Sequence, residues 1–190
     1  MERRARIKGQ AAAIALIVAT CSALPSIARA DQGLDLGERI AELARAAPRA
    51  RLKLLRRDCS GFVNTVLLQA VGVLPWGKEV LNTAAIWSEG LRRGWAVRDP
   101  DARPGDIAVF HKTVGGKGTR LTHIALVIGM DDEGTLDLVH LDRYGIKLFR
   151  MNLARPDDAR VNSRIAAARA GPEKLAGQLW RGFVRLPGEL

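Results

Sequence analysis

Apolar residues recur at helical spacing in three stretches of the first half of the chain. They predict helices over residues 36–47, 58–71 and 82–91. Pro48 ends the first stretch, and Gly72 suits the left-handed residue that often follows a helix. The apolar side chains of the second stretch share one face, so this helix is expected to pack against a core.

Beyond residue 99 the pattern changes to alternation with a period of two, which is typical of strands. The Asp-Asp-Glu-Gly segment at 131–134 predicts a hairpin turn. Residues 155–178 are rich in Ala and Arg and are interpreted as a loop with a short helix. Helices followed by a meander of strands predict an α+β fold, with N-terminal helices packed on a central antiparallel sheet. The expected strands are 107–110, 122–129, 135–141, 146–151 and 180–186.

The N-terminal segment has the order of a secretory signal peptide. Residues 1–10 are basic, residues 11–18 are purely apolar, and Ala28 and Ala30 are the small residues that a signal peptidase needs. Cleavage is expected after Ala30, which predicts a periplasmic or secreted protein. Lipidation at Cys21 is the weaker alternative, because the residue before it is neither Gly nor Ala.

Removal of residues 1–30 leaves one expected domain, residues 31–190, with its core over about 52–187. No stretch reaches the roughly 18–20 uninterrupted apolar residues of a spanning helix, so no stable membrane insertion is expected after cleavage, and the domain is expected to be a monomer. The remaining 25 basic and 19 acidic residues give a charge of +6. This charge favours an anionic partner such as a cell wall, and no nucleic-acid motif is present.

Cys59 is the single cysteine that remains after cleavage, and it begins the second predicted helix. The backbone N–H groups and the helix dipole at this position stabilise a thiolate, which predicts a thiol pKa within about 3.5–7.5. The same N–H groups are suited to an oxyanion of acyl transfer, with Asp58 and Ser60 shaping the helix start. The alternative is a small buried apolar residue, which is the common role of a free cysteine.

A thiol nucleophile needs a base, and two histidines fall at matching positions of the predicted hairpin. If the hairpin is symmetric about its turn, His123 and His140 are direct cross-strand neighbours with Cβ atoms about 4.5–5.5 Å apart. One imidazole then holds the orientation of the other, as in a nucleophile–base–orienter set. Zinc binding by Cys59, His111, His123 and His140 is an alternative class, but their spacing matches no usual zinc signature.

Four segments resemble the NlpC/P60 family of papain-like cysteine peptidases of bacterial cell walls, to which the CHAP amidases are related. The segments are D-C-S-G-F-V at 58–63, P-G-D-I-A-V-F at 104–110, H-I-A-L-V-I-G at 123–129 and V-H at 139–140. The resemblance implies a papain-like fold without metal or cofactor. It makes Cys59 the nucleophile, His123 the base and His140 the residue that orients the base. The tyrosine that several members carry before the cysteine is missing here.

The resemblance implies an exported hydrolase that cleaves amide bonds of peptidoglycan stem peptides through a Cys-His-His triad and a thioester. The alternatives are a CHAP-type N-acetylmuramoyl-L-alanine amidase, a papain-like acyl transferase, and a non-catalytic module that binds the wall. Peptidoglycan is the expected partner. The candidates for further substrate contact are Trp76, His111, Arg143 and Tyr144.

Overall fold

The computed structural model describes residues 34–188, with gaps at 115–119, 167–171 and 173. The predicted signal peptide therefore lies outside the described residues, and it stays a prediction. Within the described ranges, every helix is too short or too polar to span a bilayer.

The three predicted helices are present. Helix α1 covers Leu36–Ala46 and continues as the 3₁₀ turn η2, Ala47–Arg49, because proline is tolerated in the first turn of a helix but not inside one. Helix α2 covers Cys59–Val71 and ends at Gly72, whose φ of 83° is the left-handed conformation expected there. Helix α3 covers Thr83–Arg93.

Six strands form one antiparallel sheet in the order β1-β6-β2-β3-β4-β5. The α+β prediction is thus confirmed, and a short helix, α4 at Ala176–Leu179, lies in the segment where one was expected. The two-residue strand β1 was not predicted. The strands are β1 Ala96–Val97, β2 Ile107–His111, β3 Leu121–Met130, β4 Thr135–Asp142, β5 Gly145–Asn152 and β6 Trp180–Val184.

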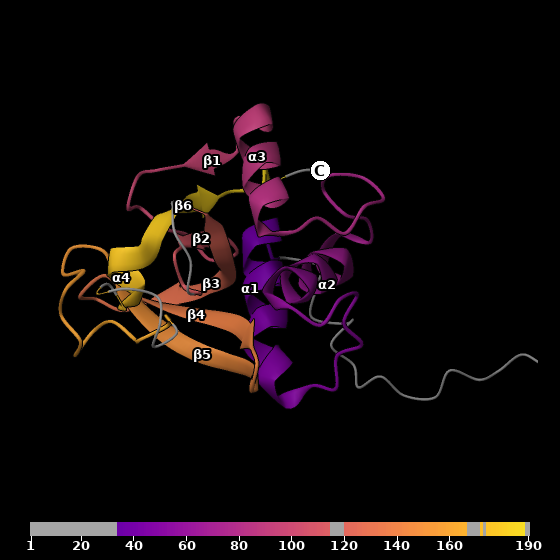
Figure 1. The fold of residues 1–190 in the computed structure, drawn as a ribbon. Helices are drawn as coiled ribbons and strands as arrows, with labels where there is room; N and C mark the ends of the chain where they lie inside the picture. Colours follow the sequence, from indigo (N-terminus) through magenta and orange to yellow (C-terminus); the bar gives the residue numbers. More distant parts are fainter. Residues whose placement is uncertain (1–33, 115–119, 167–171, 173, 189–190) are drawn as a thin grey trace, which may run out of the picture. The chain divides into compact units, whose positions relative to one another are not determined.

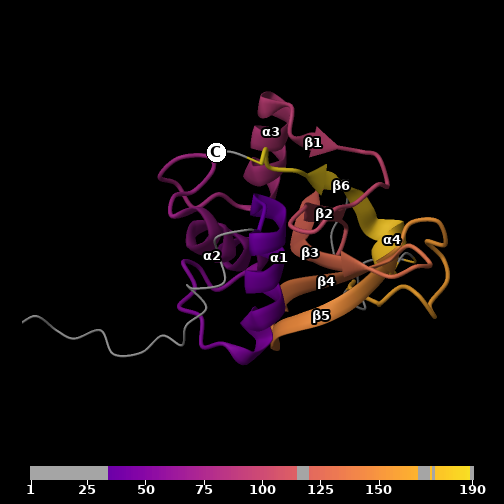
Figure 2. The ribbon, with the colours of Figure 1, turned by 180° about the vertical axis from the view of Figure 1, so that it is seen from behind.

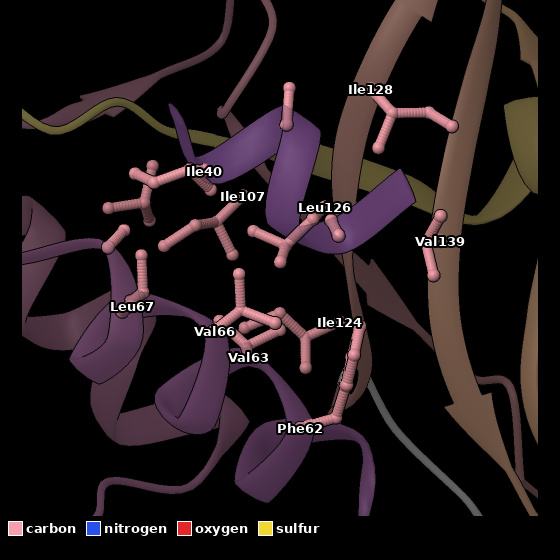
Figure 3. Packing of buried hydrophobic residues seen from close by; sticks show 14 of the residues in the cluster. Ile40, Phe62, Val63, Val66, Leu67, Ile107, Ile124, Leu126, Ile128 and Val139 are labelled. Carbon is pink, nitrogen blue, oxygen red and sulfur yellow. The ribbon is translucent and has the colours of Figure 1, made fainter. Parts of the chain in front are cut away.

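The sheet separates two apolar clusters. Helices α1 and α2 cover one face and α4 lies on the other side, as Figures 1 and 2 show from opposite directions. Figure 3 shows side chains of α2, among them Val63 and Val66, directed at Ile124 and Leu126 of β3. This packing fixes the start of α2 against the start of β3, where the candidate site lies.

The hairpin between β3 and β4 differs from the predicted symmetric one. Near the turn Met130 pairs with Leu136, and after an irregularity between Val127 and Gly129 the pairing becomes Leu126 with Val139. The direct pairing of His123 with His140 is therefore wrong. The reason is the turn, where Asp131 bonds to Thr135 through N–H···O=C (3.0 Å) and closes the hairpin later than assumed.

Candidate active site

The chain before α2 is fixed by a network around Arg56. Asp58 is the N-cap of the helix, and its carboxylate accepts from the Gly61 N–H (2.7 Å) and the Ser60 hydroxyl (2.8 Å). Arg56 Nε donates to Asp58 (2.5 Å), and its Nη2 donates to Ser60 Oγ (2.5 Å). Burial opposes the charge of Asp58, but the hydrogen bonds from Arg56, Gly61 and Ser60 outweigh it and lower the pKa of this carboxyl.

Gly61 is required by this close approach. A Cβ at Gly61 would lie 2.0 Å from the carbonyl oxygen of Arg56, which is backbone and has no room to yield. The first turn of α2 therefore packs directly on the preceding segment. This accounts physically for the glycine in the D-C-S-G string and keeps Cys59 at the first position of the helix.

The Cys59 thiol is half-buried at this helix start. Its Sγ lies 3.8 Å from Thr83 Oγ1, and the backbone of Ile124 and Ser60 lies close to it. Burial is the largest influence and raises the pKa of the thiol, and Asp58 raises it further; the Thr83 hydroxyl and the backbone of Ile124 and Ser60 lower it by a smaller amount. The expected lowering of the pKa is therefore wrong, because desolvation outweighs the helix start.

The backbone of Ile124 comes close to the sulfur at the point where the pairing of β3 with β4 ends. The Val127 N–H donates to the Asp106 carbonyl, and the Val127 carbonyl accepts from the Gly105 N–H, so the backbone groups of Val127 point to the β2 side. Because the direction alternates along a strand, the backbone N–H of Ile124, three positions earlier, points to the β4 side. The last described pair of the β3–β4 ladder is Leu126 with Val139. Ile124 lies beyond that pair, and its backbone lies close to the Cys59 thiol and lowers the pKa of that thiol.

His123 and His140 also lie where the pairing of β3 with β4 ends, and they contact each other. His123 Nε2 and His140 Nδ1 are 2.6 Å apart, and the two rings meet edge to face with centroids 4.8 Å apart. His140 is further fixed by Phe149, whose ring centroid lies 4.7 Å away. Among the described residues, no hydrogen bond joins Cys59 to either ring. With Nε2 occupied, Nδ1 is the nitrogen of His123 that remains for a thiol proton.

Both imidazoles are held neutral. Burial lowers the pKa of His123 to about 3, with His140 contributing and Asp142 opposing the change. Burial also lowers the pKa of His140, against the charge of Asp142. At neutral pH the site therefore holds an uncharged thiol and an uncharged histidine pair rather than a thiolate–imidazolium pair.

We expect the buried histidine to make folding sensitive to mild acid. Since the fold lowers the pKa of His123 from 6.5 to about 3, the unfolded chain binds a proton that the folded chain excludes between these values. The contribution of His123 to the free energy of unfolding is therefore at its maximum above about pH 6.5. Below that pH it decreases by about 1.4 kcal/mol per pH unit. Urea unfolding should give a free energy about 2 kcal/mol smaller at pH 5 than at pH 7 from this residue. His123→Asn should show a smaller decrease, and equal decreases would contradict the expectation.

A cleft of about 500 Å³ opens beside Cys59. The residues that line it come from the segment before α2, the starts of α2 and α3, and the start of β3. Neither histidine of the pair is among them. The lining residues are Arg56, Asp58, Cys59, Ser60, Asn82, Thr83, Ala84, Arg120, Leu121 and Thr122.

The structure brings Asp58, Cys59 and Ser60 to this cleft but leaves the other candidates outside its lining. Trp76 Nε1 donates to Asn64 Oδ1 (3.0 Å), and its ring packs against the helix-side cluster. The remaining three candidates are also not among the lining residues: His111 ends β2 and pairs with Leu121 of the lining, and Arg143 covers the exposed ring of Tyr144 in the β4–β5 turn at 4.6 Å.

Sequence reasoning missed Arg56, Thr83 and Arg120 as residues of the site. Thr83 follows the helix cap Asn82, and a capping position gives no sign of what lies across from it. Among the described residues, no group of three or more His, Cys, Asp or Glu side chains is placed to hold a metal ion.

A half-buried thiol at a helix start and a histidine pair on the sheet that this helix covers are the elements of a papain-like cysteine hydrolase. The family model of the CHAP domain matches residues 53–141, a range that includes α2, β3 and nearly all of β4. This segment is a CHAP domain, of a papain-like cysteine amidase/peptidase family related to NlpC/P60. The predicted resemblance to papain-like cysteine hydrolases is thus confirmed, and the family that matches is CHAP, the relative of NlpC/P60. No curated protein and no solved structure matches the chain.

The CHAP domain defines the chemistry at a general level. The chain is a cysteine peptidase or amidase of the peptidoglycan hydrolase class and acts on amide bonds of peptidoglycan. CHAP hydrolases of cell walls act outside the cytoplasm.

Proposed function

We propose that this chain is an endopeptidase of peptidoglycan stem peptides, with Cys59 as nucleophile, His123 as general base and acid, and His140 as the residue that orients His123. One observation carries the proposal: two consecutive residues of β3 join the two halves of the site. The backbone of Ile124 lies close enough to the Cys59 thiol to lower its pKa, and His123 contacts His140 through Nε2. The same short segment of β3, His123 and Ile124, therefore contributes to the surroundings of the thiol and to the histidine pair.

The neutral resting state determines the order of proton transfers. The Cys59 proton moves to His123 Nδ1 as the sulfur attacks the amide carbonyl carbon, because neither group is ionised beforehand. The tetrahedral oxyanion is stabilised by backbone N–H groups at the start of α2, and the Thr83 hydroxyl is a side-chain donor beside them. His123 then gives its proton to the departing amine, which breaks the C–N bond and leaves a thioester.

Hydrolysis of the thioester repeats these roles in reverse. Neutral His123 takes a proton from water, the hydroxide oxygen bonds to the thioester carbon, and the C–S bond breaks. The sulfur recovers the proton from His123, and the products are a carboxylic acid and the original thiol. Every proton is returned, so no metal or redox partner is required by this scheme.

Digestion of purified peptidoglycan by the full chain, with fragments identified by mass spectrometry, tests the proposal. An endopeptidase releases fragments cut within the stem peptide, with the new carboxyl terminus inside the peptide. Release of intact stem peptides from the glycan would contradict it and indicate an N-acetylmuramoyl-L-alanine amidase. New amide-linked products in the presence of an added amine would indicate an acyl transferase.

His140 is expected to act by positioning rather than by touching substrate. His140→Ala removes the partner of His123 Nε2, so we expect kcat to fall by about 10²–10³ with a smaller change in KM. His140→Asn offers an amide oxygen at a similar place and should retain most of kcat. Steady-state kinetics of both variants on a soluble stem peptide measures the difference. Equal losses in the two variants would contradict a positioning role and point to loss of packing against Phe149.

A further inference from the structure

The cleft beside Cys59 contains three charged side chains, and two of them neutralise each other. Arg56 donates to Asp58 and to Ser60, and it also donates to the carbonyl oxygens of Val80 (3.2 Å) and Leu81 (3.5 Å). The guanidinium of Arg56 is therefore occupied by hydrogen bonds to other residues of the protein. The Asp58 carboxylate is in turn occupied by Arg56, Ser60 and Gly61.

Arg120 is the third charge of the cleft, and it has no such partner. It precedes β3, its side chain is exposed, and within the described ranges it makes neither a side-chain hydrogen bond nor an ion pair. The cleft therefore carries one uncompensated positive charge. In a cleft with walls of low dielectric, such a charge attracts an anionic group of the ligand more strongly than the same charge on open surface.

The position of Arg120 relates it to the reacting atoms. Arg120 is four positions before Ile124, whose backbone lies close to the sulfur, so it lies about 13 Å back along an extended strand. An extended peptide ligand has the same rise per residue. A group bound by Arg120 would then be a few residues from the amide at Cys59 and would belong to the same ligand molecule.

We propose that Arg120 binds a free carboxylate of the substrate and makes the enzyme selective for acidic stem peptides. This proposal rests on the proposed function, because it assumes that the cleft holds the peptide being cut. A peptide keeps a carboxylate at its C-terminal end and at each acidic residue, whereas amidation removes that charge. The planar guanidinium forms two parallel hydrogen bonds with a carboxylate, which gives direction as well as attraction.

Two matched peptides test the proposal: one stem peptide with free carboxylates and the same peptide with those carboxylates amidated. The wild-type chain should cleave the acidic form with a kcat/KM about 10- to 100-fold higher, the range of a charge-assisted bond. Arg120→Gln should reduce that ratio to within a few-fold of one, and Arg120→Lys should retain part of it. Arg181→Gln is the matched control, since Arg181 is an exposed arginine of β6 that lies outside the cleft.

Affinity separates this proposal from the proposed function. Binding of both peptides to full-length Cys59→Ala protein, with and without Arg120→Gln, is measured by calorimetry without any turnover. Preference for the acidic peptide that disappears with Arg120→Gln supports the carboxylate site even if neither peptide is cleaved. Equal affinity or equal kcat/KM for the two peptides overturns it, even if wild-type cleavage confirms the endopeptidase.

Discussion

Cys59→Ala is expected to abolish peptidoglycan hydrolysis, with a loss in kcat of about 10⁴ or more. The sulfur is the atom that bonds to the substrate carbon in the proposed mechanism, and alanine offers no substitute. The neutral His123 has no thiol proton to accept in this variant, so the histidine pair alone is not expected to replace it. Fragment release from purified peptidoglycan, followed over days by mass spectrometry, is the measurement.

The same substitution should leave the fold nearly unchanged, which makes the loss of activity interpretable. Cys59 is half-buried, and α2 is held by the Asp58 cap and by the packing of Phe62 and Val63 rather than by the sulfur. Cys59→Ser is a second variant that keeps a hydrogen-bonding group beside the Thr83 hydroxyl. Both should unfold within about 1 kcal/mol of the wild-type chain. Fragments released equally by the alanine variant would refute Cys59 as the nucleophile.

Arg185→Ala is expected to cause the largest loss of stability among the substitutions considered. Asp106 is only 2% exposed, and Arg185, which follows the neighbouring strand β6, binds it through Nε (3.0 Å to Oδ1) and Nη2 (2.7 Å to Oδ2). Hydrogen bonding to Asp106 raises the pKa of this guanidinium. Removing it leaves a buried carboxylate with the Arg103 N–H (2.9 Å) as its described partner.

The expected cost is about 2–4 kcal/mol, below that of a fully buried pair because Arg185 is partly exposed. Urea unfolding at pH 7 measures it. The double variant Asp106→Asn with Arg185→Met should recover part of the loss, because it removes the uncompensated charge. Arg92→Ala, which breaks the exposed pair with Glu89, is the control and should change stability little. A loss no larger than that of this control would contradict the expectation.

The sequence by itself determined the secondary structure of the site. The apolar stripe predicted α2, the Asp58 cap placed Cys59 at its start, and the alternation after residue 99 predicted strands that carry His123 and His140. These features are local, because a cap, a stripe and a strand each depend on residues a few positions apart. The order of helices and strands was sufficient for the α+β fold for the same reason.

The tertiary structure decided how the two histidines meet. In the register next to the turn, Met130 with Leu136, strand alternation would place His123 and His140 on opposite faces of the sheet. The one-residue irregularity between Val127 and Gly129 shifts β4 and returns both rings to one face. The predicted pairing had the correct face with the wrong register, because a bulge has no reliable signal in the sequence.

Only the tertiary structure decided the ionisation and the lining of the site. Motif and helix position predicted a thiolate, but packing of Cys59 against β3 desolvates the sulfur, and burial lowers the pKa of His123 to about 3. Arg120 lies 61 positions beyond Cys59 in the sequence, and no local pattern relates the two residues. They line the same cleft because the fold places the start of β3 next to the start of α2. Charge, burial and cleft shape depend on which distant segments come together, and that information is in the fold rather than in any short motif.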